Sequence, residues 1–165
     1  MQEVPAIIHW LQVSDIGTGI RESIWLFPIV ETTHVLALSL SVGVLVWFDF
    51  RLLGLSMRHQ PISQVHKQIM PFALIGFVLM FVTGILLFWS EAEKCYVSGF
   101  FRLKVLALVL AGVNAMIFEF TTKRSIEDWD KAPLPPRRVQ IAGLMSLITW
   151  TLVIGAGRAT AYNLF

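Results

Sequence analysis

The sequence predicts an all-α integral membrane protein, a four-helix up-down bundle preceded by a short N-terminal interfacial helix. Two observations support this fold class. First, 56% of the 165 residues are apolar and only 15% are charged, a balance far more apolar than that of a soluble domain. Second, a helix needs about 20 mostly apolar residues to span a bilayer, and four windows meet that length, at residues 25–48, 69–90, 100–120 and 139–157.

The chain divides into two parts. Residues 1–24 are expected to form a segment that lies in the membrane interface, and residues 25–165 to form the four-helix transmembrane domain. Apolar residues gather near the start, before glycines that favour a break in the helix: Ile7, Ile8, Trp10 and Leu11, then Gly17 and Gly19. The segment lacks the basic and short apolar regions of a cleavable signal peptide, so we expect it to remain on the mature chain.

Each predicted span carries one face of small or polar residues at helical spacing, the kind of face on which membrane helices pack. Pro71 is in the first turn of the second span, where a proline costs little. Short connections favour antiparallel neighbours. The four faces are Glu31, His34, Leu38, Ser41, Leu45 and Phe48; Ala73, Gly76, Met80, Thr83 and Leu87; Lys104, Ala107, Ala111, Asn114 and Ala115; and Gly143, Ser146, Trp150, Val153 and Gly157.

Basic residues between the spans predict the orientation, because cytoplasmic loops are rich in Lys and Arg. They gather in the first and third loops: Arg51, Arg58 and Lys67, then Lys123, Arg124, Lys131, Arg137 and Arg138. We therefore expect a multi-pass protein of the bacterial inner (cytoplasmic) membrane with both termini in the periplasm. The net charge of +2 is too small to indicate a nucleic-acid partner.

The single cysteine, Cys95, excludes an internal disulfide and metal sites that need several thiolates. A buried or reduced thiol is the simpler interpretation, and a disulfide between protomers of a homo-oligomer is the alternative.

Ionisable residues are expected to gather in the outer half of the bundle. At 1.5 Å per residue, His34 lies about 13 Å below Trp25, and Glu31 lies one turn above it on the same face. Lys104 is about one turn into the third span, and Arg158 is where the fourth span ends. We expect Glu31 to pair with Lys104 or Arg158. Intramembrane ionisable residues mark functional sites by default, although a network that only joins helices is the alternative.

The residue types favour a haem ligand at this site. A neutral imidazole in a dry pocket binds haem iron well, and cationic side chains near the surface suit the haem propionates. Copper is the rival cofactor, since thioether sulfur suits Cu(I), and Met57 and His59 are close together in the first cytoplasmic loop.

Other titratable residues are assigned weaker roles. His66, at the start of the second span, is interpreted as a surface or cap histidine, with a second cofactor as the alternative, and Ser63 as the helix cap. His9 lies on the same outer side as His34. Asp49, Arg51 and Glu119 are expected to form a second charged group that fixes helix register by salt bridges or admits protons or a substrate.

Three stretches resemble a known family. "HVLALSLSVGVLVWFDFRLLGL", with His34, Gly43 and Arg51, is similar to the first helix of four-span bacterial membrane proteins of the copper-resistance D type and the related haem-binding HemJ-type protoporphyrinogen oxidases. "PFALIGFVLMFVTGILLF" resembles their second helix through Thr83-Gly84, and "FFRLKVLALVLAGVNAMIFEF" their third through Lys104.

The resemblance implies a haem b cofactor with His34 as an axial ligand and Lys104 as the second ligand or a propionate partner. Asp49 stands where those oxidases tend to be basic, and the closing "GAGRATAYNLF" is more similar to the uncharacterised branch of the group. This leaves open whether the chain is an enzyme.

Taken together, the sequence predicts a haem-b-binding inner-membrane protein with a redox or electron-transfer role. His34 and Lys104 are the expected iron ligands, with Glu31 and Arg158 beside them. The expected partners are the lipid bilayer, a redox partner protein and a second copy of the chain. The alternatives are a non-catalytic membrane subunit and a copper-handling membrane protein.

Overall fold

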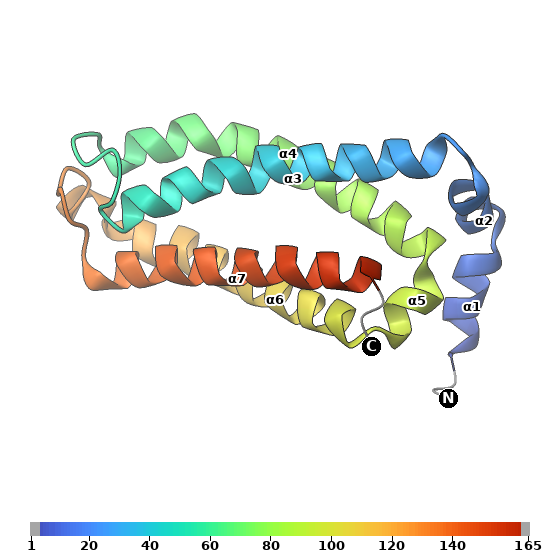
Figure 1. The fold of residues 1–165 in the computed structure, drawn as a ribbon. Helices are drawn as coiled ribbons and strands as arrows, with labels where there is room; N and C mark the ends of the chain where they lie inside the picture. The colour runs from blue at the N-terminus through green and yellow to red at the C-terminus, as the bar shows by residue number, and fades with distance from the viewer. Residues whose placement is uncertain (1–3, 163–165) are drawn as a thin grey trace.

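The structure, a computed structural model, describes residues 4–162, and of Thr122 only the backbone. This part of the chain is an all-α bundle of four long helices (Figure 1), which confirms the predicted fold class. The long helices are α3 (Leu26–Leu52), α4 (Ile62–Ser90), α6 (Gly99–Ile117) and α7 (Arg137–Tyr162). The π-helical turn η1 (Phe118–Thr122) extends α6, and the 3₁₀ segment η2 (Lys123–Asp128) follows. Each helix includes most of its predicted span and continues into the polar flanks.

The outer surface of the bundle is apolar. All four long helices are long and apolar enough to cross a membrane. Side chains more than half exposed include Val78 and Phe81 on α4, Leu106 on α6 and Ile141 on α7. A soluble monomer rarely exposes apolar patches on this scale, so a lipid bilayer is the environment that this surface fits.

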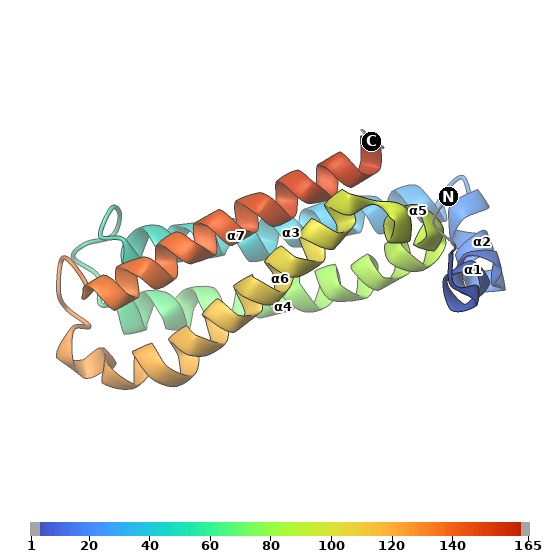
Figure 2. The same ribbon diagram turned by 90° about the horizontal axis from the view of Figure 1, so that it is seen from below.

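The four helices pack as two antiparallel pairs, α3 with α4 and α6 with α7, and α3 also packs on α7 (Figures 1 and 2). The first pair is in backbone contact at Gly76, since a Cβ there would lie 2.7 Å from the Ser41 nitrogen and 2.9 Å from the Ala37 oxygen. Small residues at the seam are what allow membrane helices to approach this closely.

The predicted inward faces are largely buried. Their buried members are Ser41, Phe48, Ala73, Gly76, Thr83, Ala107, Ala111, Gly143, Trp150 and Val153. Two residues were assigned wrongly, because Glu31 and Ala115 are exposed. The buried residues of α6 are Ala107 and Ala111, and the next buried residue is Phe118 at the start of η1, so Ala115 lies beside this buried stripe. Glu31 is on a turn of α3 where a carboxylate remains accessible.

Two short helices, rather than one, precede the first span: α1 (Ala6–Val13) and α2 (Asp15–Glu22). The predicted break at Gly17 and Gly19 is wrong, because both glycines lie inside α2. The break is at Ser14, whose hydroxyl caps α2 by accepting from the Gly17 nitrogen at 3.2 Å. Gly17 serves close packing instead: a Cβ there would lie 2.5 Å from the Leu11 oxygen.

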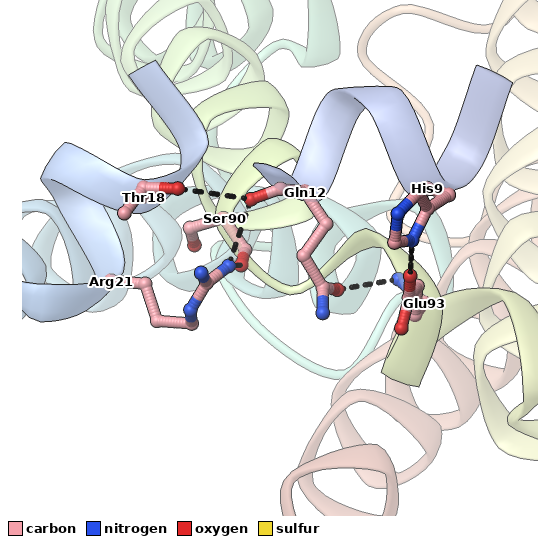
Figure 3. Close-up of polar contacts among 6 residues, drawn as sticks. All are labelled: His9, Gln12, Thr18, Arg21, Ser90 and Glu93. Atoms are coloured by element: carbon pink, nitrogen blue, oxygen red, sulfur yellow. Dashed lines mark hydrogen bonds and ion pairs between the residues drawn. The ribbon is translucent and has the colours of Figure 1, made fainter. Parts of the chain in front are cut away.

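Polar contacts hold α1 and α2 against the end of α4 and the short helix α5 (Ala92–Val97), as Figure 3 shows. The His9 ring nitrogen Nδ1 lies 2.6 Å from Glu93 Oε1, and the Gln12 side chain accepts from the Glu93 nitrogen at 2.9 Å. Arg21 donates to the backbone oxygen of Gln12 at 2.9 Å and to the backbone oxygen of Ser90 at 3.1 Å. The N-terminal segment is therefore packed on the bundle at the end that carries both termini.

At the opposite end, Arg51 joins two connecting segments, residues 53–61 between α3 and α4 and residues 129–136 between η2 and α7. Its side chain is fully buried; Nε donates to the Gln60 oxygen at 2.9 Å and Nη2 to the Ala132 oxygen at 3.1 Å. The α4 N-terminus is capped from the second segment, since the Asp130 carboxylate accepts from the Ser63 nitrogen and hydroxyl at 2.7 and 2.8 Å. The local sequence suggested Ser63 as the cap, but the cap is Asp130.

Candidate functional site

His34 is half-buried on α3 and directed toward α4. Its Nδ1 lies 2.9 Å from the Thr83 hydroxyl, and that hydroxyl donates to the Leu79 oxygen at 2.7 Å. The Thr83 oxygen therefore accepts the proton on Nδ1, which leaves the lone pair of the neutral imidazole on Nε2. A histidine fixed through one nitrogen, with the other able to bind, is the usual arrangement of a metal-ligating histidine.

Lys104 reaches the same region from α6. It is half-buried and close enough to His34 for their charges to interact. A Cβ at Gly157 on α7 would lie 3.7 Å from Lys104 Cδ and 3.8 Å from Nζ, so the stem lies along the α7 backbone. In residues 4–162, Nζ makes no hydrogen bond or ion pair. The two expected iron ligands thus lie in the same region of the bundle.

Glu31 and Arg158 do not join this pair, and the expected pairing of Glu31 with Lys104 or Arg158 is not found. Both side chains are exposed. Arg158 donates to the Tyr162 hydroxyl at 2.8 Å, and its guanidinium lies 5.3 Å from the centre of that ring. Arg158 therefore has a partner one turn further along α7, and Glu31 makes no ion pair with any residue that the structure describes.

The two side chains at this site are of types that can bind haem iron. Haem iron takes one or two protein ligands, and the imidazole of His34 and the amine of Lys104 supply that number. Gly84 lies against the imidazole, since a Cβ there would lie 3.2 Å from His34 Cε1. Glycines at 84 and 157 thus allow both candidate ligands to lie against helix backbones. Within residues 4–162, no group of three His, Cys, Asp or Glu side chains is placed to hold a metal ion.

The second predicted charged group is not formed. The Asp49 carboxyl group lies near Ser146, Arg51 donates to loop carbonyls, and Glu119 pairs with His66 and Lys123. Asp49 and Arg51 are two positions apart, and residues at that spacing point to different sides of a helix.

His66 is a buried residue, so its interpretation as a surface or cap histidine is wrong. It is 8% exposed, and its ring centre lies 5.4 Å from that of Phe48 and 6.4 Å from that of Phe118. Its Nε2 lies 3.2 Å from Glu119 Oε2. Glu119 belongs to η1, and single π-helical turns often occur at functional sites. The partner is 53 residues away, so no local pattern identified the pair.

The remaining candidates lie away from His34. His9 is at the surface with Glu93, Met57 packs on the apolar cluster around Phe48, and His59 is exposed. Cys95 is buried on α5, and burial raises the pKa of its thiol to about 11. The monomer therefore presents no reactive thiol at its surface within residues 4–162.

Four apolar helices with an apolar exterior and a few polar groups inside define a multi-pass membrane protein built as a four-helix bundle. The chain belongs to DUF6644, described as a family of unknown function, whose model matches residues 4–163. No curated protein and no solved structure matches the chain.

Proposed function

We propose that this protein binds haem b in the end of the bundle nearest its termini and serves a redox or electron-transfer role in a bacterial inner membrane. The observation that carries the proposal is the contact of His34 with Thr83, which leaves Nε2 of a membrane-buried imidazole as a Lewis base. When bound, the haem would supply one-electron redox chemistry.

The chain's own groups have separate tasks in this proposal. Thr83 fixes the ring orientation and tautomer of His34, as partners of ligating histidines do. Lys104 provides either a second iron ligand or a cation for a propionate. Gly84 and Gly157 let the His34 and Lys104 side chains lie close against α4 and α7. Both termini lie at the same end of the bundle (Figure 1), and the basic loops at the other end favour a cytoplasmic location for that end.

The resemblance of the first three helices to the copper-resistance D and HemJ-type group also favours haem. It does not assign a substrate, because the closing segment with Arg158 follows the uncharacterised branch. The proposal is therefore for a cofactor and a redox role, with an electron-transfer protein as the partner.

An optical spectrum of the purified full-length protein, expressed with added haem precursor, tests the proposal. We expect a Soret band that His34→Ala abolishes and that Thr83→Val weakens and shifts. His59→Ala, an exposed histidine at the opposite end of the bundle, is the matched control and should keep the wild-type spectrum. A colourless wild-type protein that also fails to bind added hemin would contradict the proposal and favour a non-catalytic subunit.

Lys104→Met distinguishes the two roles of the lysine. Loss of a low-spin spectrum with retention of haem would identify an iron ligand, whereas an unchanged spectrum with weaker haem binding would identify a propionate partner. Elemental analysis for copper covers the alternative cofactor: bound copper lowered by substitution of Met57 and His59, without a Soret band, would replace haem by copper.

A further inference from the structure

Asp49 on α3 is an acidic residue enclosed in the bundle with part of its hydrogen-bonding capacity unused. It is 3% exposed, its carboxyl group lies near the Ser146 side chain on α7, and its Oδ2 has no hydrogen-bond partner in the structure. The two helices are closely packed here, because a Cβ at Gly143 would lie 3.2 Å from the Asp49 backbone oxygen. A carboxyl group is thus enclosed between α3 and α7 with one oxygen unpaired.

Within residues 4–162, no ion pair compensates this carboxyl group. The titratable groups on the elements around it are His66 on α4, Glu119 on η1, Arg51 on α3 and Arg138 at the start of α7. None of them makes an ion pair with Asp49 in the part of the chain described. His66 is bonded to Glu119, and Arg51 donates Nε and Nη2 to backbone oxygens, while its Nη1 has no hydrogen-bond partner in the structure.

The remaining stretches of the neighbouring helices add no further charge. On α7, the residues between Arg138 and Arg158 include no ionisable side chain, and on α6 there is none between Lys104 and Glu119. Burying an unpaired carboxylate is far more costly than burying the neutral acid, which needs only ordinary hydrogen bonds.

We propose that Asp49 is a proton-binding site within the membrane domain, a carboxylic acid that is protonated at neutral pH and exchanges its proton with water. Asp49 is three residues from Leu52, the last residue of α3, so it lies within one helical turn of that end of the bundle. Acidic residues inside membrane bundles mark functional sites, and proton relays are one of these. A metal cation is a poorer fit, since hard cations take six or more oxygen ligands. The inference does not depend on haem.

Infrared spectroscopy of the whole protein in lipid nanodiscs tests this assignment without a reagent that must reach the site. At pH 7 we expect the carbonyl band of a protonated carboxylic acid, absent from Asp49→Asn and shifted after transfer to heavy water. Glu31→Gln is the matched control, an exposed acid on the same helix, and should leave the band unchanged. If the acid carbonyl region of wild type and Asp49→Asn is the same, Asp49 is ionised and the proposal is wrong. A band that does not shift in heavy water would also overturn it, because the proton would not exchange.

Thermal unfolding gives a second and independent measurement. Asn has the shape of a neutral carboxylic acid, so Asp49→Asn should fold and unfold at the wild-type temperature at pH 7. If Asp49 were a carboxylate with an essential charge, this variant would unfold at a clearly lower temperature, and the assignment of a protonated acid would fail. Dicyclohexylcarbodiimide, which modifies protonated carboxyl groups in apolar surroundings, should label Asp49 in the wild type and leave Asp49→Asn unlabelled.

Discussion

Gly76 of α4 and Ser41 of α3 are in backbone contact: a Cβ on Gly76 would lie 2.7 Å from the Ser41 nitrogen and 2.8 Å from its Cβ. The contact lies in the seam of the most extensively packed helix pair. Ser41 is fully buried and donates its hydroxyl proton to the Ala37 oxygen at 2.8 Å, so its neighbourhood has no spare room.

Gly76→Ala is therefore expected to force α3 and α4 apart. Overpacking of this kind lowers the free energy of unfolding by about 1 to 3 kcal/mol, which unfolding in mixed detergent micelles would measure. Gly43→Ala on α3 is the control, since nothing lies within 4 Å of a Cβ there. The control should be neutral or up to about 1 kcal/mol more stable, because Ala favours helix over Gly. Equal stability of the two variants would contradict the close contact.

The docking of α2 depends on Gly17. A Cβ at this position would lie 2.5, 2.9 and 3.2 Å from the backbone oxygens of Leu11, Gln12 and Trp89. We expect Gly17→Ala to release α1 and α2 and to speed hydrogen exchange over residues 6–22, while the four spans stay protected. Gly19→Ala in the same helix should behave as wild type, as no atom lies within 4 Å of its Cβ position. An unchanged exchange pattern in Gly17→Ala would show that the segment is not held as described.

The Cys95 thiol should react slowly. Burial raises its pKa to about 11 from the ordinary value of 9.0, so at pH 8 only about one thiol in a thousand is the reactive thiolate. The rate of alkylation by iodoacetamide should rise about tenfold for each pH unit up to about pH 11. Protein unfolded in detergent is the control and should level off near pH 9.

The same shift makes stability depend on pH. The folded chain holds the thiol proton of Cys95 more tightly than the unfolded chain does. The contribution of this group to the free energy of unfolding is therefore fully present below pH 9 and is lost as the pH rises toward 11. Fast alkylation of the folded protein at neutral pH, or a disulfide between protomers, would contradict the buried position.

We expect Arg51 to stabilise the end of the bundle where the two connecting segments meet. Arg51→Met removes two hydrogen bonds from a charged donor and leaves the Gln60 and Ala132 oxygens unpaired, at a cost of about 3 kcal/mol in the free energy of unfolding. Arg124→Met is the matched control: its side chain is exposed, and the expected change is below about 0.5 kcal/mol. A small effect in Arg51→Met would mean that the two oxygens find other partners.

The fold followed from periodicity and composition because a bilayer imposes both. A spanning helix must satisfy its own backbone and cover about 30 Å, so length and apolarity locate it without knowledge of its neighbours. The small-residue faces of α4 and α7 were found for a related reason, since Gly76 and Gly143 are positions where only a small residue permits backbone contact.

The site was harder to predict, because hydrogen-bond partners are chosen in three dimensions. The sequence placed His34 near Lys104 only because both residues were expected in the outer half of the bundle. It also predicted that Glu31 pairs with Lys104 or Arg158, whereas Arg158 binds Tyr162 and Glu31 makes no ion pair in the part of the chain described. The His66–Glu119 contact depends on the π-helical turn η1, which adds a residue to a helical turn and has no reliable sequence pattern. The cap on α4 comes from Asp130, 67 residues beyond Ser63.

The distant origin of that cap bears on how the protein is made. A chain emerges from the ribosome N-terminus first, so α3 and α4 enter the membrane before Asp130 and Ala132 have been synthesised. The α4 N-terminus and the Arg51 side chain must then wait, partly unpaired, until the third span is in place. The α3–α4 pair thus reaches its final packing only late in biogenesis. Nascent chains that stop before Asp130 should therefore be the species most readily degraded by membrane quality-control proteases.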